Sequence, residues 1–202
     1  QQGDAFRIIY VHVPAAYLSM MIYMVMAVSA GIGLIWRIKL SHAVAAAAAP
    51  IGAWFTFLAL FTGAVWGKPM WGGWVIWSDP RVVSEWILLL LYFGYMALRG
   101  AIEDTGKADR ASAVLAMVGA VNVPIIHFSV EWWTSVHQGA TLIRKGGPAM
   151  DPEMVLPLIA MIFGFTFIFA VFLLRRVRAE VLYRERRTRW VKELVLSAEG
   201  QR

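Results

Sequence analysis

The sequence predicts an all-α fold, a polytopic membrane helical bundle with five spans in one integral membrane domain covering residues 1–202. Of its 202 residues, 59% are hydrophobic and only 16% are charged. The apolar residues gather in runs close to the roughly 20 residues that a helix needs to cross hydrocarbon. A helix satisfies its own backbone hydrogen bonds there, so successive apolar runs of this length indicate a helical bundle.

The five expected spans are separated by short polar connections, and the third is the shortest. A run of alanines, Ala45 to Ala49 continued by Ala53, predicts a face of the second span for close helix packing. Pro50 is expected to bend or break that helix. The spans are Val11 to Trp36, Ala43 to Trp66, Val82 to Leu98, Ala111 to Glu131 and Met154 to Leu174.

The basic residues predict the orientation of the bundle. Of the 19 Lys and Arg residues, 14 lie in two connections and a tail on one side, and 5 lie on the other. The positive-inside rule places the tail, residues 175–202, in the cytoplasm. It places a Trp-rich loop, about residues 66–81, and a second loop, about 131–153, outside. The net charge of +6 is therefore a topology signal, and no nucleic-acid partner is expected.

The odd number of spans puts Gln1 outside. Residues 1–10 contain no signal peptide or apolar run that explains the export of that end. We therefore expect a sixth transmembrane helix upstream of residue 1.

Two classes of chemistry are excluded by composition. The chain has no cysteine, which rules out disulfides and thiolate metal sites within it. Gly63, Gly67 and Lys68 give G-x-x-x-G-K followed by Pro69, which has the wrong spacing for a phosphate-binding P-loop and lacks its Ser or Thr. Energy for any transport would come from a partner, and no catalytic residue is assigned.

The segment W-G-K-P-M-W-G-G-W-V-I-W-S-D-P-R, residues 66–81, holds four of the ten tryptophans. Interfacial anchoring needs only a few indole rings. Trp71, Trp74 and Trp77 follow at i, i+3 and i+6, so one helical or 3₁₀ turn would project them from one side. The segment is typical of a membrane-surface platform for a flat aromatic ligand.

The end of this segment has a local explanation. Asp79 fits a helix N-cap and Pro80 the first helical position, so the third span begins at Val82. This capping is preferred over a direct catalytic role for Asp79.

The four histidines differ in position. His12 opens the first span at the outer interface, with Pro14 in its first turn. His137 lies in the second outer loop, four residues after Trp133 and on the same face if the helix persists. His127 lies near the outer end of the fourth span. His42 is expected to be a solvated residue of a cytoplasmic connection.

Each histidine alone has an ordinary explanation as an interfacial imidazole. Together, His12 and His137 come from distant segments to the face that carries the tryptophans, and two neutral imidazoles are a common axial pair for haem iron. Haem propionates need cationic partners. The outer-face candidates are Lys68, Arg81 and Arg7, with Arg144 and Lys145 more distant.

Four segments resemble the haem exporter protein C family, CcmC, of bacterial cytochrome c maturation, which has a tryptophan-rich periplasmic signature. They are R-I-I-Y-V-H-V-P-A-A, V-W-G-K-P-M-W-G, N-V-P-I-I-H-F-S-V-E-W-W and V-H-Q-G, in this order. The usual signature is W-G-x-W-W-x-W-D-x-R. Here Val75 replaces the second of the adjacent tryptophans and Ser78 is inserted before Asp79, which changes the register between Trp77 and Asp79 by one residue.

The resemblance implies haem b held by His12 and His137 as axial ligands, with no such role for His127. It implies six spans, a multi-pass protein of the bacterial inner membrane, and a periplasmic haem site. It also implies delivery of haem to the chaperone CcmE, after which the ATP-driven CcmA and CcmB complex, with CcmD, releases the loaded chaperone.

Three alternatives remain open. A haem permease would need a polar or aromatic path through the bilayer, whereas nearly all ionisable residues lie in the connections. A bis-histidine membrane cytochrome would usually place its histidines within facing helices. A cofactor-free scaffold would leave the convergence of histidine and tryptophan unexplained.

Overall fold

The computed structural model of the chain describes residues 3–137, 139 and 150–199. In this part of the chain every regular element is helical, and five helical segments are long and apolar enough to cross a membrane. This confirms the predicted all-α membrane bundle with five spans. The elements are η1 (Gly3–Ile8), α1 (Ile9–Trp36), α2 (Lys39–Trp71), α3 (Pro80–Ala101), α4 (Thr105–Gly119), α5 (Asn122–Trp132), α6 (Pro152–Arg184) and α7 (Arg189–Glu199).

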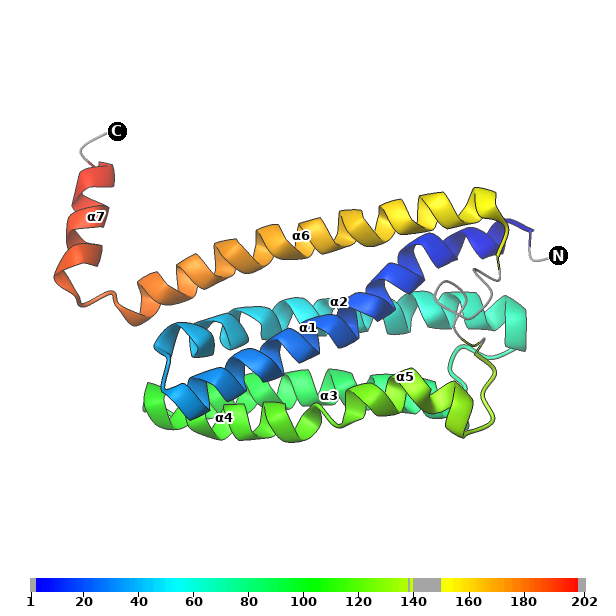
Figure 1. The fold of residues 1–202 in the computed structure, drawn as a ribbon, viewed down its shortest axis with the longest axis horizontal. Coiled ribbons are helices and arrows are strands. Elements are labelled where there is room, and N and C mark those ends of the chain that lie inside the picture. The colour runs from blue at the N-terminus through cyan, green and yellow to red at the C-terminus, as the bar shows by residue number, and fades with distance from the viewer. Residues whose placement is uncertain (1–2, 138, 140–149, 200–202) are drawn as a thin grey trace.

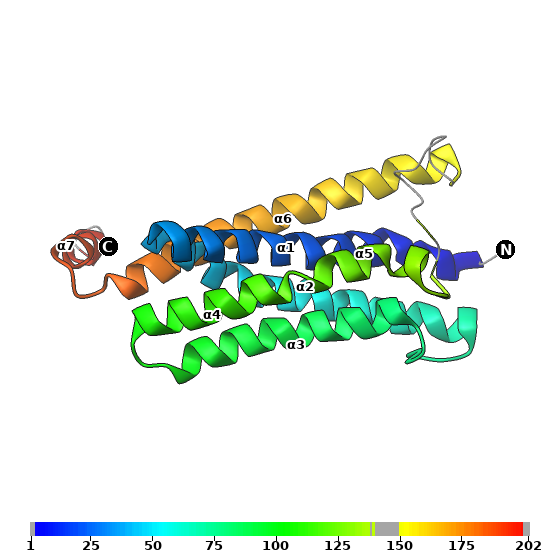
Figure 2. The ribbon, with the colours of Figure 1, turned by 60° about the horizontal axis from the view of Figure 1, so that its bottom comes forward.

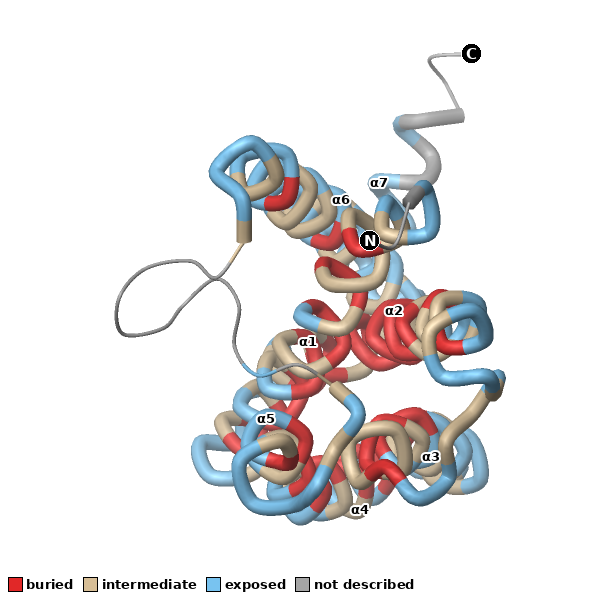
Figure 3. Tube along the Cα trace, turned by 90° about the vertical axis from the view of Figure 1, so that its right-hand side faces the viewer, coloured by how far each residue is buried: buried red, intermediate tan, exposed pale blue. Residues whose placement is uncertain are grey.

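The helices α1 to α6 lie roughly along one common axis, and the chain passes back and forth between the two ends of the bundle (Figures 1 and 2). One end of the bundle, here called the aromatic end, holds the first described residues, the connection 72–79 and the segment 133–137. The other, the basic end, holds the connections 37–38 and 102–104 and the helix α7. Viewed from the aromatic end, α1 and α2 lie between α6 and the group formed by α3, α4 and α5 (Figure 3).

Small residues let the two central helices pack closely. Ala45, Ala48 and Ala49 of α2 are fully buried, as the alanine run predicted. Pro50 does not end the helix, because α2 continues to Trp71. At Gly52 an added Cβ would lie 2.2 Å from the hydroxyl oxygen of Tyr92, so only glycine admits this ring of α3.

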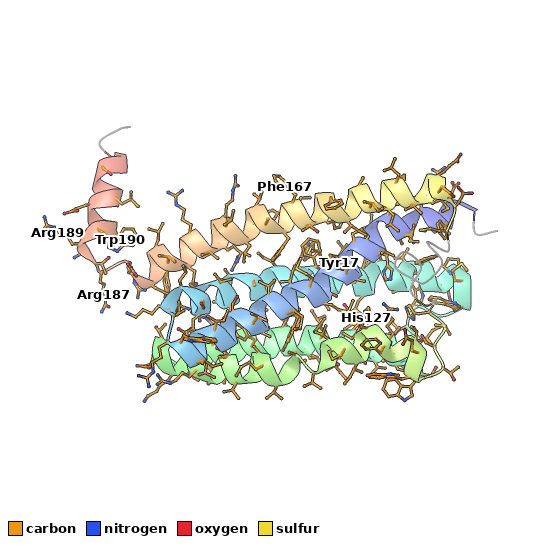
Figure 4. The ribbon with its side chains drawn as sticks, in the orientation of Figure 1. Tyr17, His127, Phe167, Arg187, Arg189 and Trp190 are labelled. Atoms are coloured by element: carbon orange, nitrogen blue, oxygen red, sulfur yellow. The ribbon has the colours of Figure 1, made fainter. Side chains whose placement is uncertain are left out.

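A cluster of charged side chains joins three helices at the basic end. Arg184 of α6 donates to Asp109 of α4 at 2.8 and 3.0 Å, and Arg99 of α3 donates to Glu180 of α6 at 2.6 Å. Arg99 also pairs with Asp109. These contacts hold a helix that is otherwise exposed along much of its length, as Figure 3 shows. Phe167, for example, points away from the bundle and is 71% exposed (Figure 4).

His42 corrects one expectation at this end. The connection between α1 and α2 is only two residues long, so α2 begins at Lys39 and His42 lies within it. Its ring packs against Gly33 of α1, and the residue is buried. It is therefore not a solvated loop residue.

Two further expectations, for Pro14 and for the helix face of His137, are wrong, whereas the fourth span is confirmed as the helical segment Thr105–Trp132. Pro14 lies inside α1 rather than in its first turn, because the chain is already helical from Gly3 through η1. The fourth span consists of two helices, α4 and α5, which are separated at residues 120–121. The helix α5 ends at Trp132, and Trp133 is extended with φ −135° and ψ 161°. His137 therefore shares no helix face with Trp133.

Candidate functional site

A cavity of about 400 Å³ lies at the aromatic end and is bounded by α1, α2, α3, α5 and the two connections of that end. This volume falls in the range of ordinary small-molecule sites, about 300–1,000 Å³. Its lining includes five of the residues that the sequence singles out: His12, Trp71, Trp74, Arg81 and His137. His127 lines it too, on the half of the bundle nearer the aromatic end (Figure 4).

His12 is held by α2. Its Nδ1 lies 3.1 Å from the carbonyl oxygen of Ala59 and 3.1 Å from Oγ1 of Thr62. The Thr62 hydroxyl donates to Leu58 O at 2.7 Å, and a carbonyl can only accept, so His12 Nδ1 is the donor. The neutral ring then keeps its lone pair on Nε2, which is the nitrogen left for a ligand.

His137 lies in the segment 133–137, beside the tryptophans. Its ring centroid is 5.4 Å from that of Trp71, and its Nδ1 is 3.2 Å from Oδ1 of Asp79. Burial lowers the pKa of the His137 imidazole. The negative charge of Asp79 raises this pKa, and the positive charge of Arg81 lowers it further. The ring is therefore neutral at pH 7, the state that a metal ligand requires.

The tryptophans do not share one helical turn. The helix α2 extends through Trp66 and ends at Trp71, so the connection begins later than expected. Gly72 then takes the left-handed conformation at φ 79°, which favours glycine, and the following residues are irregular. Trp71 and Trp74 line the cavity.

Trp77 and Lys68 stand beside the cavity rather than in its described lining. The Trp77 ring packs on Trp86 at 5.9 Å between centroids and is 65% exposed. The Lys68 ammonium donates to the carbonyl of Gly72 at 3.3 Å and lies 5.9 Å from the centroid of the Trp74 ring. Lys68 thus fixes the start of the connection.

The capping role expected for Asp79 and Pro80 is confirmed. Asp79 is the N-cap of α3, with Pro80 in the first turn, and its Oδ1 accepts from the N–H groups of Arg81 and Val82. Arg81 therefore lies in the first turn of α3, and it lines the cavity. Arg7 is exposed and pairs with Asp4 at 3.2 Å. The remaining candidates, at positions 144 and 145, lie outside the described residues.

Sequence reasoning missed Glu85. It lies one helical turn after Arg81, lines the cavity, and is buried with its Oε1 accepting from the Ser19 hydroxyl at 2.6 Å. The available signal was a carboxylate inside an apolar span, which is rare and usually functional. Trp86, the next residue, also lines the cavity.

Several buried nitrogens at the cavity have no hydrogen-bond partner among the described residues. They are Nε1 of Trp66, Nε1 of Trp86 and Nδ1 of His137, and all three residues line the cavity. Nδ1 of His137 still has the Asp79 carboxylate within 3.2 Å. Buried donors are nearly always satisfied, so the two indole N–H groups indicate a ligand or water that accepts hydrogen bonds. With two imidazoles, indole rings and one guanidinium, the site fits a flat metal macrocycle with anionic substituents.

Comparison with known proteins agrees with the motifs. The family profile "Heme exporter protein C" matches residues 1–192. The Heme exporter protein C of Escherichia coli K12 is 52% identical over 196 residues, which are 97% of this chain and 78% of that protein.

Two more distant relatives extend the comparison. The Heme exporter protein C of Haemophilus influenzae is 47% identical over 194 residues, 96% of this chain and 78% of that protein. A cytochrome c biosynthesis ccmC-like mitochondrial protein of Marchantia polymorpha is 41% identical over 182 residues, 90% of this chain and 76% of that protein. The chain therefore belongs to the heme exporter protein C family.

Proposed function

We propose that this protein binds haem b in the cavity at the aromatic end, with His12 and His137 as axial ligands, and delivers it to the haem chaperone CcmE for cytochrome c maturation. One observation carries the proposal. Two imidazoles from segments 125 residues apart, each with Nδ1 turned toward a protein acceptor, line the same cavity. This leaves both Nε2 atoms for the iron.

The rest of the lining supports a porphyrin. The rings of Trp71 and Trp74 offer apolar area to a flat ligand, and their partial exposure, 39% and 59%, leaves one edge of the site accessible. Arg81 supplies a fixed positive charge for a propionate. The unpartnered indole N–H groups of Trp66 and Trp86 are further donors.

The membrane placement follows from charge. The basic end carries α7 and most Lys and Arg residues and faces the cytoplasm; the cavity then opens at the periplasmic face of the bacterial inner membrane. Delivery to CcmE takes place from this side. The CcmA and CcmB complex, with CcmD, supplies the energy to release the loaded chaperone. We assign no catalytic residue in this chain.

Haem titration tests the binding half of the proposal. Detergent-purified protein is stripped of haem and titrated with ferric haem, and the Soret band reports binding. Replacing both Trp71 and Trp74 by alanine should weaken binding by at least tenfold, because stacking on one ring is worth about 1–3 kcal/mol. Trp54→Ala is the matched control, because Trp54 is 61% exposed on α2 and is not among the residues that line the cavity. Equal affinity of the double variant and the control would contradict the proposed stacking.

Transfer to the chaperone tests the delivery half. Haem-loaded protein is mixed with purified CcmE, and haem covalently attached to CcmE is detected by haem staining after denaturing electrophoresis. Transfer should require His137, Trp71 and Trp74. A variant that still binds haem but transfers none would separate delivery from binding. If a variant that has lost haem binding at this cavity still supports haem attachment to CcmE at the wild-type rate, delivery from this site is contradicted.

A further inference from the structure

Asp79 makes more contacts than a helix cap requires. Its Oδ1 accepts from Arg81 N at 3.0 Å and Val82 N at 3.2 Å, which completes the cap of α3. Its Oδ2 accepts from the Ser135 hydroxyl at 2.6 Å and from Val136 N at 2.8 Å. The second oxygen thus ties the start of α3 to the segment 133–137, which carries His137.

A second aspartate in the chain shows what capping alone needs. Asp151 caps α6 and is followed by Pro152, as Asp79 is followed by Pro80. Its Oδ1 accepts from Glu153 N at 3.0 Å, and the residue is exposed. Asp79, by contrast, has a side chain only 1% exposed. Burying a carboxylate is costly, so the burial of Asp79 needs an explanation beyond the cap.

The imidazole of His137 supplies that explanation. Its Nδ1 lies 3.2 Å from Asp79 Oδ1, and this buried nitrogen has no aligned hydrogen-bond partner among the described residues. The contact has the length of a hydrogen bond without its alignment. The backbone N–H of His137 also donates to the Ser135 hydroxyl at 3.0 Å, so one carboxylate holds both the ring and the backbone that bears it.

We propose that Asp79 is the positioning residue for His137: it fixes the segment 133–137 and takes the Nδ1–H of the ring, so that Nε2 faces the cavity as the iron ligand. This rests on the proposed haem ligation by His137. A carboxylate behind a metal-bound histidine fixes the tautomer and raises the basicity of the ligand. Asp79 thereby joins two segments of the cavity that are 56 residues apart in sequence.

The first test needs no haem. In protein labelled with ¹⁵N-histidine, the ring nitrogen shifts of His137 report which nitrogen carries the proton, and His137→Gln assigns the signals. The wild type should show the Nδ1–H tautomer, and Asp79→Asn should shift the ring toward the Nε2–H form. Asparagine remains a good N-cap, so α3 keeps its start. An Nε2–H ring in the wild type, or the same tautomer in both proteins, would overturn the positioning role.

The second test uses the haem-loaded protein. Asp79→Asn should lower haem affinity about 10- to 100-fold, as loss of such a carboxylate does at other metal sites. It should also raise the reduction potential of the bound haem, because a weaker donor stabilises ferric iron less. Asp151→Asn, the matched cap variant, should change neither quantity. Ser135→Ala leaves the cap intact and removes one tether, so it should lower affinity by a smaller factor even if Asp79→Asn does not fold.

The outcomes separate the two proposals. A wild-type protein that binds no haem contradicts the proposed function, while the tautomer of His137 still decides whether Asp79 orients the ring. Haem affinity and potential that are unchanged in both Asp79→Asn and Ser135→Ala, with wild-type haem binding intact, would show that Asp79 is a cap and nothing more.

Discussion

Gly63 of α2 lies against the ring of His12, and Gly63→Ala should disturb haem binding without disturbing the fold. An added Cβ would lie 3.1 Å from Cε1 and 3.6 Å from Nδ1 of His12. Carbon atoms in good contact are about 3.5–4.0 Å apart, so the ring must move by about 0.4–0.9 Å. It cannot move freely, because its Nδ1 is held by Ala59 and Thr62 on the same helix.

This displacement is comparable to the tolerance of a ligand site, about 0.5 Å. We expect the haem affinity of Gly63→Ala to fall about tenfold, which corresponds to about 1.4 kcal/mol. The measurement is a titration with ferric haem followed at the Soret band. The melting temperature of the haem-free protein in the same detergent should change little, because the higher helix propensity of alanine offsets the cost of its close contact with His12.

Gly164→Ala in α6 is the matched control. It makes the same chemical change inside a long helix, and an added Cβ there meets nothing within 4 Å among the described residues. Haem affinity should equal that of the wild type. If Gly63→Ala binds haem as tightly as Gly164→Ala, the ring of His12 does not hold the iron in the position that the structure gives it.

Three further predictions concern stability in detergent, measured by thermal unfolding of the haem-free protein. Asp109→Ala should destabilise the bundle by about 3 kcal/mol, because it leaves two partly buried guanidinium groups without this partner; Arg189→Ala, at a pair with side chains 93% and 60% exposed, should change little. Glu85→Ala should cost about 1 kcal/mol, because it removes one of the two acceptors near the buried Ser19 hydroxyl and leaves Ala16 O at 2.7 Å, whereas Glu85→Gln keeps both and should cost less. Gly52→Ala should be strongly destabilising, because its Cβ would overlap the buried ring of Tyr92. Each prediction fails if its two proteins melt at the same temperature. The pairs are Asp109→Ala with Arg189→Ala, Glu85→Ala with Glu85→Gln, and Gly52→Ala with wild type.

The spans were predictable because length and hydropathy alone decide which segments can cross a membrane. The first and last residues of the helices were harder to predict, because a helix continues past the apolar run wherever neighbouring residues or caps bind its terminal backbone groups. The second helix ends at Trp71 because Gly72 adopts a left-handed conformation, not because the apolar run stops near Trp66. The sequence placed His42 in a loop because it does not show that the connection before α2 is only two residues long. The helix therefore begins at Lys39 and includes His42.

The candidate site was predictable in its composition and not in its geometry. His12, His137 and the tryptophans stand out by residue type and by their shared end of the bundle. Their arrangement depends on contacts between distant segments, such as Asp79 with Ser135, which no local pattern encodes. Trp86 was missed because an apolar span hides which of its residues faces a cavity, whereas Glu85 carried a signal that the prediction did not use, its carboxylate inside an apolar span.

The absorption spectrum of purified protein tests the axial ligation most directly. Wild type, His12→Ala and His137→Ala are purified from cells that make haem, and each spectrum is recorded with and without added imidazole. Wild type should show a low-spin bis-imidazole spectrum. Each variant should lose it, and imidazole should restore it in part by filling the vacated position. An unchanged low-spin spectrum in both variants would contradict haem ligation by His12 and His137.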